Sequence, residues 1–314
     1  MKKVIAIVVA LGLIILGISY FIIPTQLLVN NVANASINVD GAFRDVSKEK
    51  NWENWFPQKI VGDSLGMYNL NSGDYYFKVH QVLYNAIELI IKKGNTVDTS
   101  FIQFIAQGKD SVRIGWSTII NTGSNPFSRI INYFRASAIK KQTSQLLSTM
   151  VHYLEQPKNV YGLDIKLEKV TIEFMVINSK TFSHPPNIPD IYSIINDTYH
   201  YILSQKGELE GAPMLNIVVK DPETYKVQIG IPIKQKIQEN EFFKVKAMFK
   251  GGNILVANIT GPPQKIDEGI KNFNQYMLDY QRTMMAMPFQ MLITDRSKQK
   301  DSTKWITQLY YPVN

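Results

Sequence analysis

An uncharged apolar segment near the N-terminus constrains the fold more than any other feature of the sequence. The chain begins Met1-Lys2-Lys3 and then has no charged residue from Val4 to Ile23. At about 1.5 Å per residue, a helix of this length extends about 30 Å, the thickness of the hydrocarbon core of a bilayer. Lipid offers the backbone no hydrogen-bond partners, so we expect a helix, and Pro24 ends it.

A cleaved signal peptide is the alternative for this segment, but its apolar core would span only about 7–15 residues. The small-x-small triplet Ala33-Asn34-Ala35 begins ten residues beyond Ile23, far from where cleavage is expected. We therefore predict an uncleaved anchor over residues 1–26. Lys2 and Lys3 favour a cytoplasmic N-terminus, so we expect a single-pass membrane protein with an exported body.

Composition limits what the body can be. About 290 residues follow the anchor, enough for two domains, and the absence of cysteine means that their cores alone hold them together. The formal net charge is +8, but the basic residues are scattered apart from Lys140-Lys141 and the segment 296–304. Nucleic-acid binding needs basic residues clustered on one face, so we expect no nucleic-acid partner.

Residues 27–156 are predicted to form a curved antiparallel sheet closed by one long helix. Asn125-Pro126 is typical of a helix start, and apolar residues recur at helical spacing as far as Leu154. Before this helix, alternation predicts strands at 36–39, 75–83, 86–92, 96–106 and 111–122, with a helix at 40–50. Residues 157–162 are interpreted as a linker.

Residues 163–314 are predicted to contain a repeat, with halves at about 163–236 and 241–314. Pro189 and Pro213 are 24 residues apart, and Pro263 and Pro288 are 25 apart. The first half has a predicted strand at 166–177, a helix after Pro189, and strands at 213–221 and 225–233. The second has a predicted hairpin at 244–259, a helix after Pro263, and strands at 288–295 and 305–313. Two β-helix-β-β units would form a pseudo-twofold pair with a cleft between them, and the whole chain would be α+β.

Several motifs of this region resemble the GyrI-like family, the effector-binding domain of AraC-type regulators. They are Gly211-Ala212-Pro213-Met214 with Asp221, the run 227–233, Thr260-Gly261-Pro262-Pro263, the run 288–295, Trp305-Ile306-Thr307 and Tyr311-Pro312-Val313. The resemblance implies an aromatic-lined pocket for small amphipathic molecules. The pocket candidates are Phe182, Tyr199, Met214, Gln290, Trp305 and Tyr310, although each could equally be structural.

Two positions depart from the GyrI-like pattern. Gln290 stands where the family usually has a pocket glutamate, unless the register is shifted by one residue, and Pro263 replaces the tyrosine of its Gly-Pro-Tyr turn. A neutral amide is no general base and offers a cation only a dipole. Both departures argue against catalysis and against cation binding.

The first body domain resembles the START-type, or SRPBCC, helix-grip class, which includes polyketide cyclase-like proteins. The resemblance rests on the strand-helix order, the turn at 51–57 and the long closing helix. It implies a cavity for an apolar ligand between sheet and helix. The candidates for lining it, which could instead fill the core, are Trp52, Trp55, Phe77, Tyr84, Trp116 and Phe134.

Catalytic and metal-binding motifs find little support. The four histidines have no metal-ligand spacing, there is no cysteine, and the sequence has no Gly-x-Ser-x-Gly elbow and no phosphate-binding glycine loop. We therefore predict no catalytic residues, no metal and no cofactor. The leading hypothesis is a membrane-anchored protein that binds small apolar, amphipathic or lipid-like molecules and is not itself a transcription factor. A hydrolase using the GyrI-like cleft and an envelope assembly protein are the alternatives, and the sequence does not identify which proteins, if any, are partners.

Overall fold

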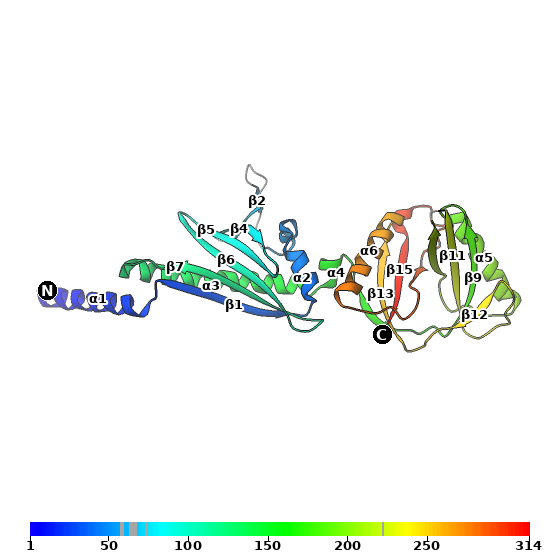
Figure 1. Cartoon of the computed structure of the whole chain (residues 1–314), viewed down its shortest axis with the longest axis horizontal. Helices are drawn as coiled ribbons and strands as arrows, with labels where there is room; N and C mark the ends of the chain where they lie inside the picture. The colour runs from blue at the N-terminus through cyan, green and yellow to red at the C-terminus, as the bar shows by residue number, and fades with distance from the viewer. Residues whose placement is uncertain (57–59, 63–67, 73–74, 222) are drawn as a thin grey trace. The chain divides into compact units, whose positions relative to one another are not determined.

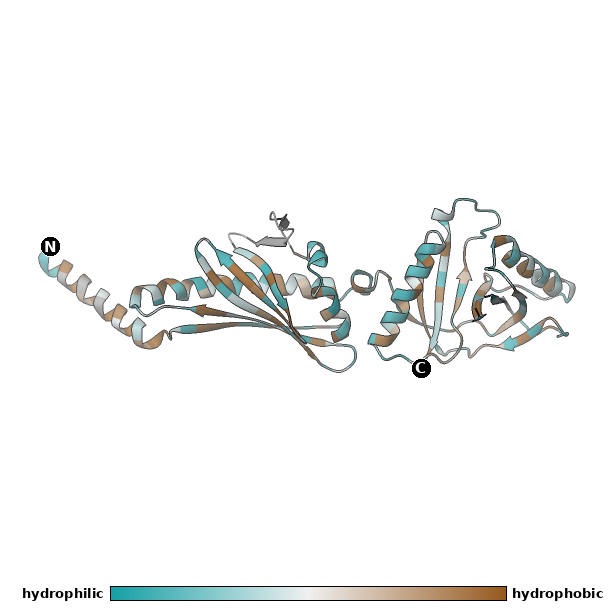
Figure 2. Ribbon diagram, turned by 45° about the horizontal axis from the view of Figure 1, so that its top comes forward, coloured by the Kyte–Doolittle hydropathy of each residue, from teal (hydrophilic) through white to brown (hydrophobic). Residues whose placement is uncertain are grey.

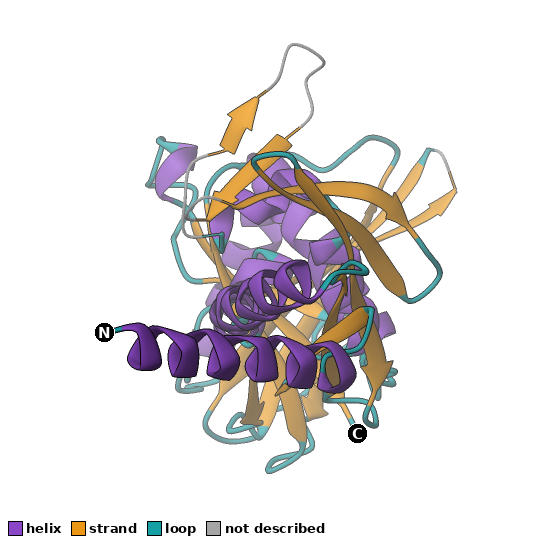
Figure 3. Cartoon of the chain, turned by 90° about the vertical axis from the view of Figure 1, so that its left-hand side faces the viewer, coloured by secondary structure: helices purple, strands orange, loops and turns teal. Residues whose placement is uncertain are grey.

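The chain is an α+β protein with curled antiparallel sheets (Figure 1). A computed structural model describes residues 1–56, 60–62, 68–72, 75–221 and 223–314. The chain divides into two compact units, Met1–Val160 and Tyr161–Asn314. Each unit has its own sheet, with helices against it (Figure 3).

The first helix, α1 (Lys2–Ile22), is the apolar segment expected from the sequence. Most of its described side chains are exposed, and the ribbon is brown to white along most of its length (Figure 2). It ends at Ile22, and the next residue, Ile23, is extended and stands immediately before Pro24. Its length and composition fit a membrane-crossing helix, and they fit a signal sequence equally.

The sheet of the first unit has the strand order β1-β7-β6-β5-β4-β3-β2, with every neighbouring pair antiparallel. Its strands are β1 (Gln26–Ala35), β2 (Ile60–Gly62), β3 (Tyr68–Ser72), β4 (Tyr75–Val82), β5 (Ala86–Lys93), β6 (Thr96–Ala106) and β7 (Val112–Asn121). The helices are α2 (Val39–Val46), the 3-10 turn η1 (Glu49–Asn54), α3 (Pro126–Leu154) and α4 (Pro157–Tyr161). Strands β4 to β7 and helix α3 lie where the alternation and the cap predicted them.

Helix α3 packs along β1 and closes the sheet. Asn125 caps it by accepting a hydrogen bond from the Ser128 backbone, and Pro126 occupies the first turn, where its missing N–H costs nothing. The Asn31 amide of β1 donates to Thr143 Oγ1 at 2.7 Å and to the Lys140 carbonyl at 3.0 Å. These bonds hold the helix in one register along the strand.

The predicted strand at 36–39 is wrong. Residues 26–35 form the strand β1 instead, and the Asn38 side chain accepts from the Asp40 backbone and caps α2, which begins at Val39. An asparagine that caps a helix this way competes with strand pairing.

The sheet of the second unit has the order β12-β9-β11-β10-β14-β15-β13-β8. Its strands are β8 (Lys166–Lys169), β9 (Phe174–Phe182), β10 (Met214–Asp221), β11 (Thr224–Ile233), β12 (Lys244–Ala247), β13 (Asn253–Thr260), β14 (Phe289–Leu292) and β15 (Ile306–Val313). Its helices are α5 (Ile188–Ser204), α6 (Pro263–Asp279) and the turn η2 (Ser302–Lys304). In Figure 1, α5 and α6 lie on the outer sides of the two halves of this sheet.

The strand order of this sheet is symmetric about its centre, so that each strand of the first half has a counterpart in the second half. Strands β9, β10 and β11 with α5 correspond to β13, β14 and β15 with α6, and the halves meet where β10 pairs with β14. At that junction Leu215 lies opposite Gln290, so these two residues occupy equivalent positions beside a pseudo-twofold axis.

Two predictions in this unit are corrected by the pairing. Residues 166–177 form two strands, β8 and β9, and residues 244–259 are not a hairpin, because β12 pairs with β9 while β13 pairs with β15 and β8. The connections cross: the Met248 backbone donates to the Glu173 carbonyl at 2.8 Å, and the Val170 backbone donates to the Gly252 carbonyl at 2.9 Å. Each half therefore sends its first strand to the edge of the other half.

Candidate functional site

The two faces of the second sheet are built differently. One face carries the core under α5, with Val176, Leu215 and Ile231 fully buried there. On the other face Met175, Met214 and Met291 form a separate apolar cluster. Successive residues of a strand point to opposite faces, so the side chains of neighbouring residues lie on different sides of the sheet.

A cleft of about 310 Å³ opens on this second face, and we call it the methionine cleft. Its floor comes from β9, β10 and β11, and its rim from the segments 246–248 and 286–289. Its lining residues are Met175, Ile177, Met214, Asn216, Gln228, Ile229, Gly230, Lys246, Ala247, Met248, Ala286, Met287, Pro288, Phe289 and Pro312. Ligand sites of proteins are usually concave, largely apolar and about 300–1,000 Å³ in volume, so the methionine cleft fits a small apolar body.

Gly230 keeps the floor of the methionine cleft open. A Cβ at this position would lie 3.0 Å from Met175 Sδ and 3.8 Å from Met214 Cβ, so any side chain would project into the space between the two methionines. Methionine is unbranched and polarisable, and it adapts to ligands of different shape. The floor therefore combines space with adaptable walls.

The polar groups of the cleft are few. The Asn216 amide donates to the Pro288 carbonyl at 2.7 Å, which fixes the rim segment, and its buried Oδ1 accepts no hydrogen bond from the described residues. Among the described lining residues, Lys246 is the one that carries a charge. Of the described residues there, none carries a carboxylate, an imidazole or a hydroxyl. A ligand would meet one cation and the amides of Gln228 and Asn216, although the Asn216 Oδ1 atom itself is buried.

Two of the six pocket candidates from the sequence belong to this face. Met214 lines the cleft, and Tyr310 packs on the methionine cluster and stacks on Phe289 with ring centroids 5.1 Å apart. Burial, and then the negative charge of Glu168, raise the pKa of Tyr310. Tyr310 therefore fills space beside the cleft.

Three other candidates lie on the opposite face. Phe182 and Tyr199 pack against the core under α5, where burial, then Asp295 and Tyr192, raise the pKa of Tyr199. Gln290 lines a hollow of about 170 Å³ that also includes Ile270 of α6. That volume is below the usual range for a ligand site. The structure therefore does not bring the six candidates together.

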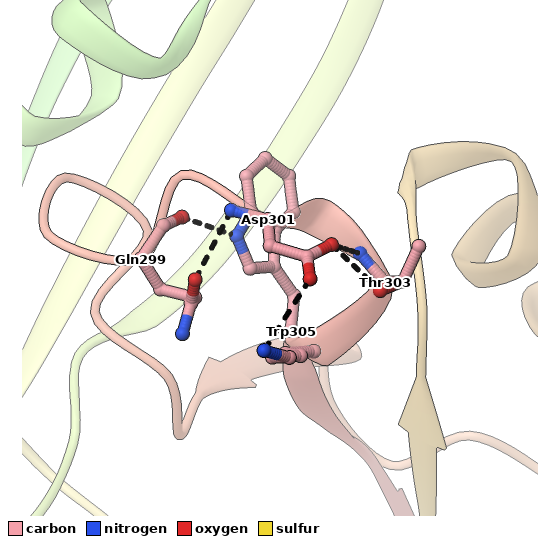
Figure 4. Close-up of polar contacts among 5 residues, drawn as sticks. Gln299, Asp301, Thr303 and Trp305 are labelled. Carbon is pink, nitrogen blue, oxygen red and sulfur yellow. Dashed lines mark hydrogen bonds and ion pairs between the residues drawn. The ribbon is translucent and has the colours of Figure 1, made fainter.

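Trp305, the sixth candidate, anchors the loop before β15 (Figure 4). Its indole N–H donates to the Gln299 carbonyl at 2.7 Å, and its ring lies 5.1 Å from the Arg296 guanidinium. Asp301 accepts from the Thr303 backbone and hydroxyl, and these bonds lower the pKa of its carboxyl. The tryptophan is buried and its polar atom is satisfied within its own loop.

A larger hollow of about 620 Å³ lies between α5 and the segment 242–243. Six of its eight lining residues are polar or charged, and Lys180 and Asp197 already pair with each other at 2.8 Å. Volume alone would favour this hollow, but an apolar ligand would leave its polar groups without water, which costs free energy. The methionine cleft is the better site for an apolar molecule.

In the first unit, the aromatic candidates divide between core and surface. Trp52, Trp55, Phe77 and Trp116 are all buried, with neighbouring rings in contact, while Tyr84 is 98% exposed and Phe134 is 68% exposed. Trp52 donates to the Val46 carbonyl and Trp116 to the Ser100 hydroxyl. The ring of Phe56 lies between the two pairs and joins the buried four into one cluster, whereas Tyr84 and Phe134 are not enclosed.

Most residues of the methionine cleft were not among the candidates. The candidates favoured aromatic residues, whereas eight of the eleven methionines lie after residue 163, at positions 175, 214, 248, 277, 284, 285, 287 and 291. The run Met284-Met285-Ala286-Met287 before β14 was the available signal, because methionine-rich surfaces are common where binding is promiscuous.

No family model and no characterised protein matches the sequence. Among solved structures, the EcmrR C-terminal domain is 15% identical, with 48% of this chain and 98% of that chain covered and a TM-score of 0.40. A Listeria innocua hydrolase is 13% identical, covering 48% and 91%, with a TM-score of 0.35. The Zhui aromatase/cyclase from Streptomyces sp. R1128 is 8% identical, covering 42% and 94%, with a TM-score of 0.32. These likenesses are coarse, so function has to be inferred from the residues of this chain.

Proposed function

We propose that the protein binds small amphipathic molecules in the methionine cleft and is anchored by α1 in a membrane, with its N-terminus cytoplasmic and its body exported. The observation that carries the binding role is the make-up of the cleft. It combines about 310 Å³ of space and an apolar methionine floor with one cation and the amides of Asn216 and Gln228. Lys2 and Lys3, in the first turn of α1, support the orientation of the anchor.

Binding is the role that this lining supports best. Hydrolysis needs a base that can activate water, and the described lining residues provide no carboxylate, imidazole or hydroxyl. Burying about 300 Å² of apolar ligand surface contributes about 7 kcal/mol, from which association costs of at least about 4 kcal/mol are subtracted. At most about 3 kcal/mol remains, so the apolar contacts alone give a weak affinity, with a dissociation constant in the millimolar range.

The polar groups of the cleft suggest which head group is preferred. Lys246 forms no ion pair with the described residues and would attract an anion, and the Gln228 amide, which also lines the cleft, would form hydrogen bonds with a hydroxyl. No acidic residue in the lining would balance a cation. We therefore expect carboxylate or hydroxyl amphiphiles to bind better than quaternary ammonium amphiphiles.

Methyl resonances of methionine can test this in the full chain, held in lipid nanodiscs. Decanoate, decanol and decyltrimethylammonium have chains of equal length and differ in head group. We expect decanoate and decanol to shift the signals of Met175, Met214 and Met248, with Met150 of the first unit's core as an unshifted reference. Equal shifts at all methionines would mean non-specific partition and would contradict the proposal.

Gly230→Val is the decisive variant, because its side chain would project between Met175 and Met214. We expect it to abolish the ligand-induced shifts. Gly115→Val is the matched control, since Gly115 also lies in a strand and a Cβ there would meet nothing within 4 Å. Binding that survives Gly230→Val unchanged would rule out the methionine cleft as the site.

A further inference from the structure

The first turns of α3 expose a stripe of apolar side chains. Phe127, Ile131 and Phe134 are spaced so that they lie on one side of the helix, and they are 63%, 66% and 68% exposed. Farther along α3 the apolar residues face inward, and Ile139, Leu146 and Met150 are buried. This stripe, 127–134, is therefore the one part of α3 whose apolar side chains face away from the sheet.

The stripe lies beside the end of α1. Arg129, in the first turn of α3, donates to the carbonyls of Tyr20 and Ile23, the latter at 2.9 Å, and its guanidinium lies 4.2 Å from the centre of the Tyr20 ring. The Thr122 hydroxyl donates to the Pro24 carbonyl at 2.5 Å. Figures 1 and 3 both show the start of α3 next to the last turns of α1. These bonds hold the stripe at the level of Tyr20, near the C-terminal end of α1.

The charge of α3 has one sign. No acidic residue occurs between Asp110 and Glu155, whereas α3 carries Arg129, Arg135, Lys140 and Lys141. Lys140 and Lys141 are exposed. They follow Phe134 by roughly 10 Å along the helix axis. A helix with an apolar side and only basic charges is typical of segments that lie on an anionic membrane surface.

We propose that the stripe 127–134 lies in the lipid interface of the membrane that α1 crosses, with Phe127, Ile131 and Phe134 at the acyl boundary. Lys140 and Lys141 would face anionic head groups. This inference rests on the proposed anchoring by α1. It gives the body a second membrane contact, which fixes its orientation on the surface.

Site-directed spin labelling tests the contact. The chain has no cysteine, so single cysteines can be placed in the full chain without other changes. Labels at Phe127→Cys and Ile131→Cys report on the stripe, and Ser144→Cys, an exposed position of the same helix, is the control. Gly12→Cys reports on α1, where a side chain would meet nothing within 4 Å. The protein is reconstituted in vesicles of phosphatidylethanolamine and phosphatidylglycerol.

We expect the ratio of oxygen to nickel-chelate collision rates to be several-fold higher at 127 and 131 than at 144. Equal ratios at 127, 131 and 144, with a high ratio at 12, would overturn the inference and leave the anchor in place. A low ratio at 12 would overturn the anchor and the contact together. If labels at 127 and 131 are shielded and show spin–spin broadening that disappears on dilution with unlabelled protein, a second copy covers the stripe and the inference is also wrong.

Discussion

Asp45 is a buried acid whose charge should weaken the first unit. It lies in α2 with 5% of its surface exposed, and its Oδ1 accepts from Asn51 at 2.7 Å. Burial raises the pKa of its carboxyl from 3.8 to about 6, against smaller opposing contributions led by Asn51. Its negative charge also adds to burial in raising the pKa of Tyr153 to about 12.

The sign of the effect follows from proton linkage. The folded state holds the proton of Asp45 more tightly than the unfolded state does. The contribution of Asp45 to the free energy of unfolding therefore falls as pH rises from about 4 to about 6, and it does not change further above that range. A shift of about 2 pKa units corresponds to about 3 kcal/mol. Asp45→Asn keeps an acceptor for Asn51 and removes the charge, so it should stabilise the first unit by up to about 3 kcal/mol above pH 7.

Guanidinium denaturation of the full chain in detergent, followed by tryptophan fluorescence, measures this. Three of the four tryptophans, Trp52, Trp55 and Trp116, lie in the first unit. The gain from Asp45→Asn should disappear near pH 4. Asp40→Asn, an exposed position of the same helix, should change stability by less than about 1 kcal/mol. A gain that is absent at neutral pH, or that is the same at pH 4, would refute the reasoning.

Three further changes have defined expectations. Arg135→Met should destabilise the first unit by about 3–5 kcal/mol, because Asp98, which Arg135 contacts through two nitrogens at 3.1 Å, would be left as a buried unpaired charge. Adding Asp98→Asn should recover most of that loss in the same denaturation assay. Trp305→Phe removes the bond to the Gln299 carbonyl and should cost about 0.5–1.5 kcal/mol in the second unit, while decanoate-induced shifts stay unchanged; a loss of those shifts would place Trp305 in the site. Asn187→Ala removes the capping box of α5 and should lower the stability of the second unit by about 0.5–2 kcal/mol, measured by Trp305 fluorescence.

Local signals predicted some elements well. The pair Asn125-Pro126 marks the start of α3 because a cap and a first-turn proline act within a few residues of each other. Strand β1 was missed because Asn30, Asn31 and Asn34 are unfavourable in strands. It forms through pairing with β7, about 90 residues away in sequence, and alternation within one segment cannot reveal such a partner.

The candidate site was harder to predict for a related reason. Alternation shows that Leu215 and Met214 point to opposite faces, but not which face receives the helices. The GyrI-like resemblance directed attention to Gln290, which the register places opposite Leu215 on the helix side. Met214 was chosen and lines the cleft, whereas Met175 and Met248 were not chosen, because their proximity depends on the pairing of β12 with β9.

The register of the two halves explains why the methionine cleft opens on one side of the pseudo-twofold axis. Pro232 pairs with Met175, and Pro312 pairs with Ile254, so the residues two positions earlier, Gly230 and Tyr310, are equivalent. Gly230 leaves space, whereas the Tyr310 ring stacks on Phe289 and fills the corresponding volume.

The exchanged edge strands then determine the charge beside each half. Lys246 of β12 pairs with Met175, and Glu168 of β8 pairs with Ile254, so a cation and an anion occupy equivalent positions. Had each half kept its own first strand, the acid would stand beside Gly230 and the lysine beside Tyr310. The crossing of the connections at 170–173 and 248–252 therefore places the cation at the open half, and the preference for anionic amphiphiles that we propose depends on that crossing.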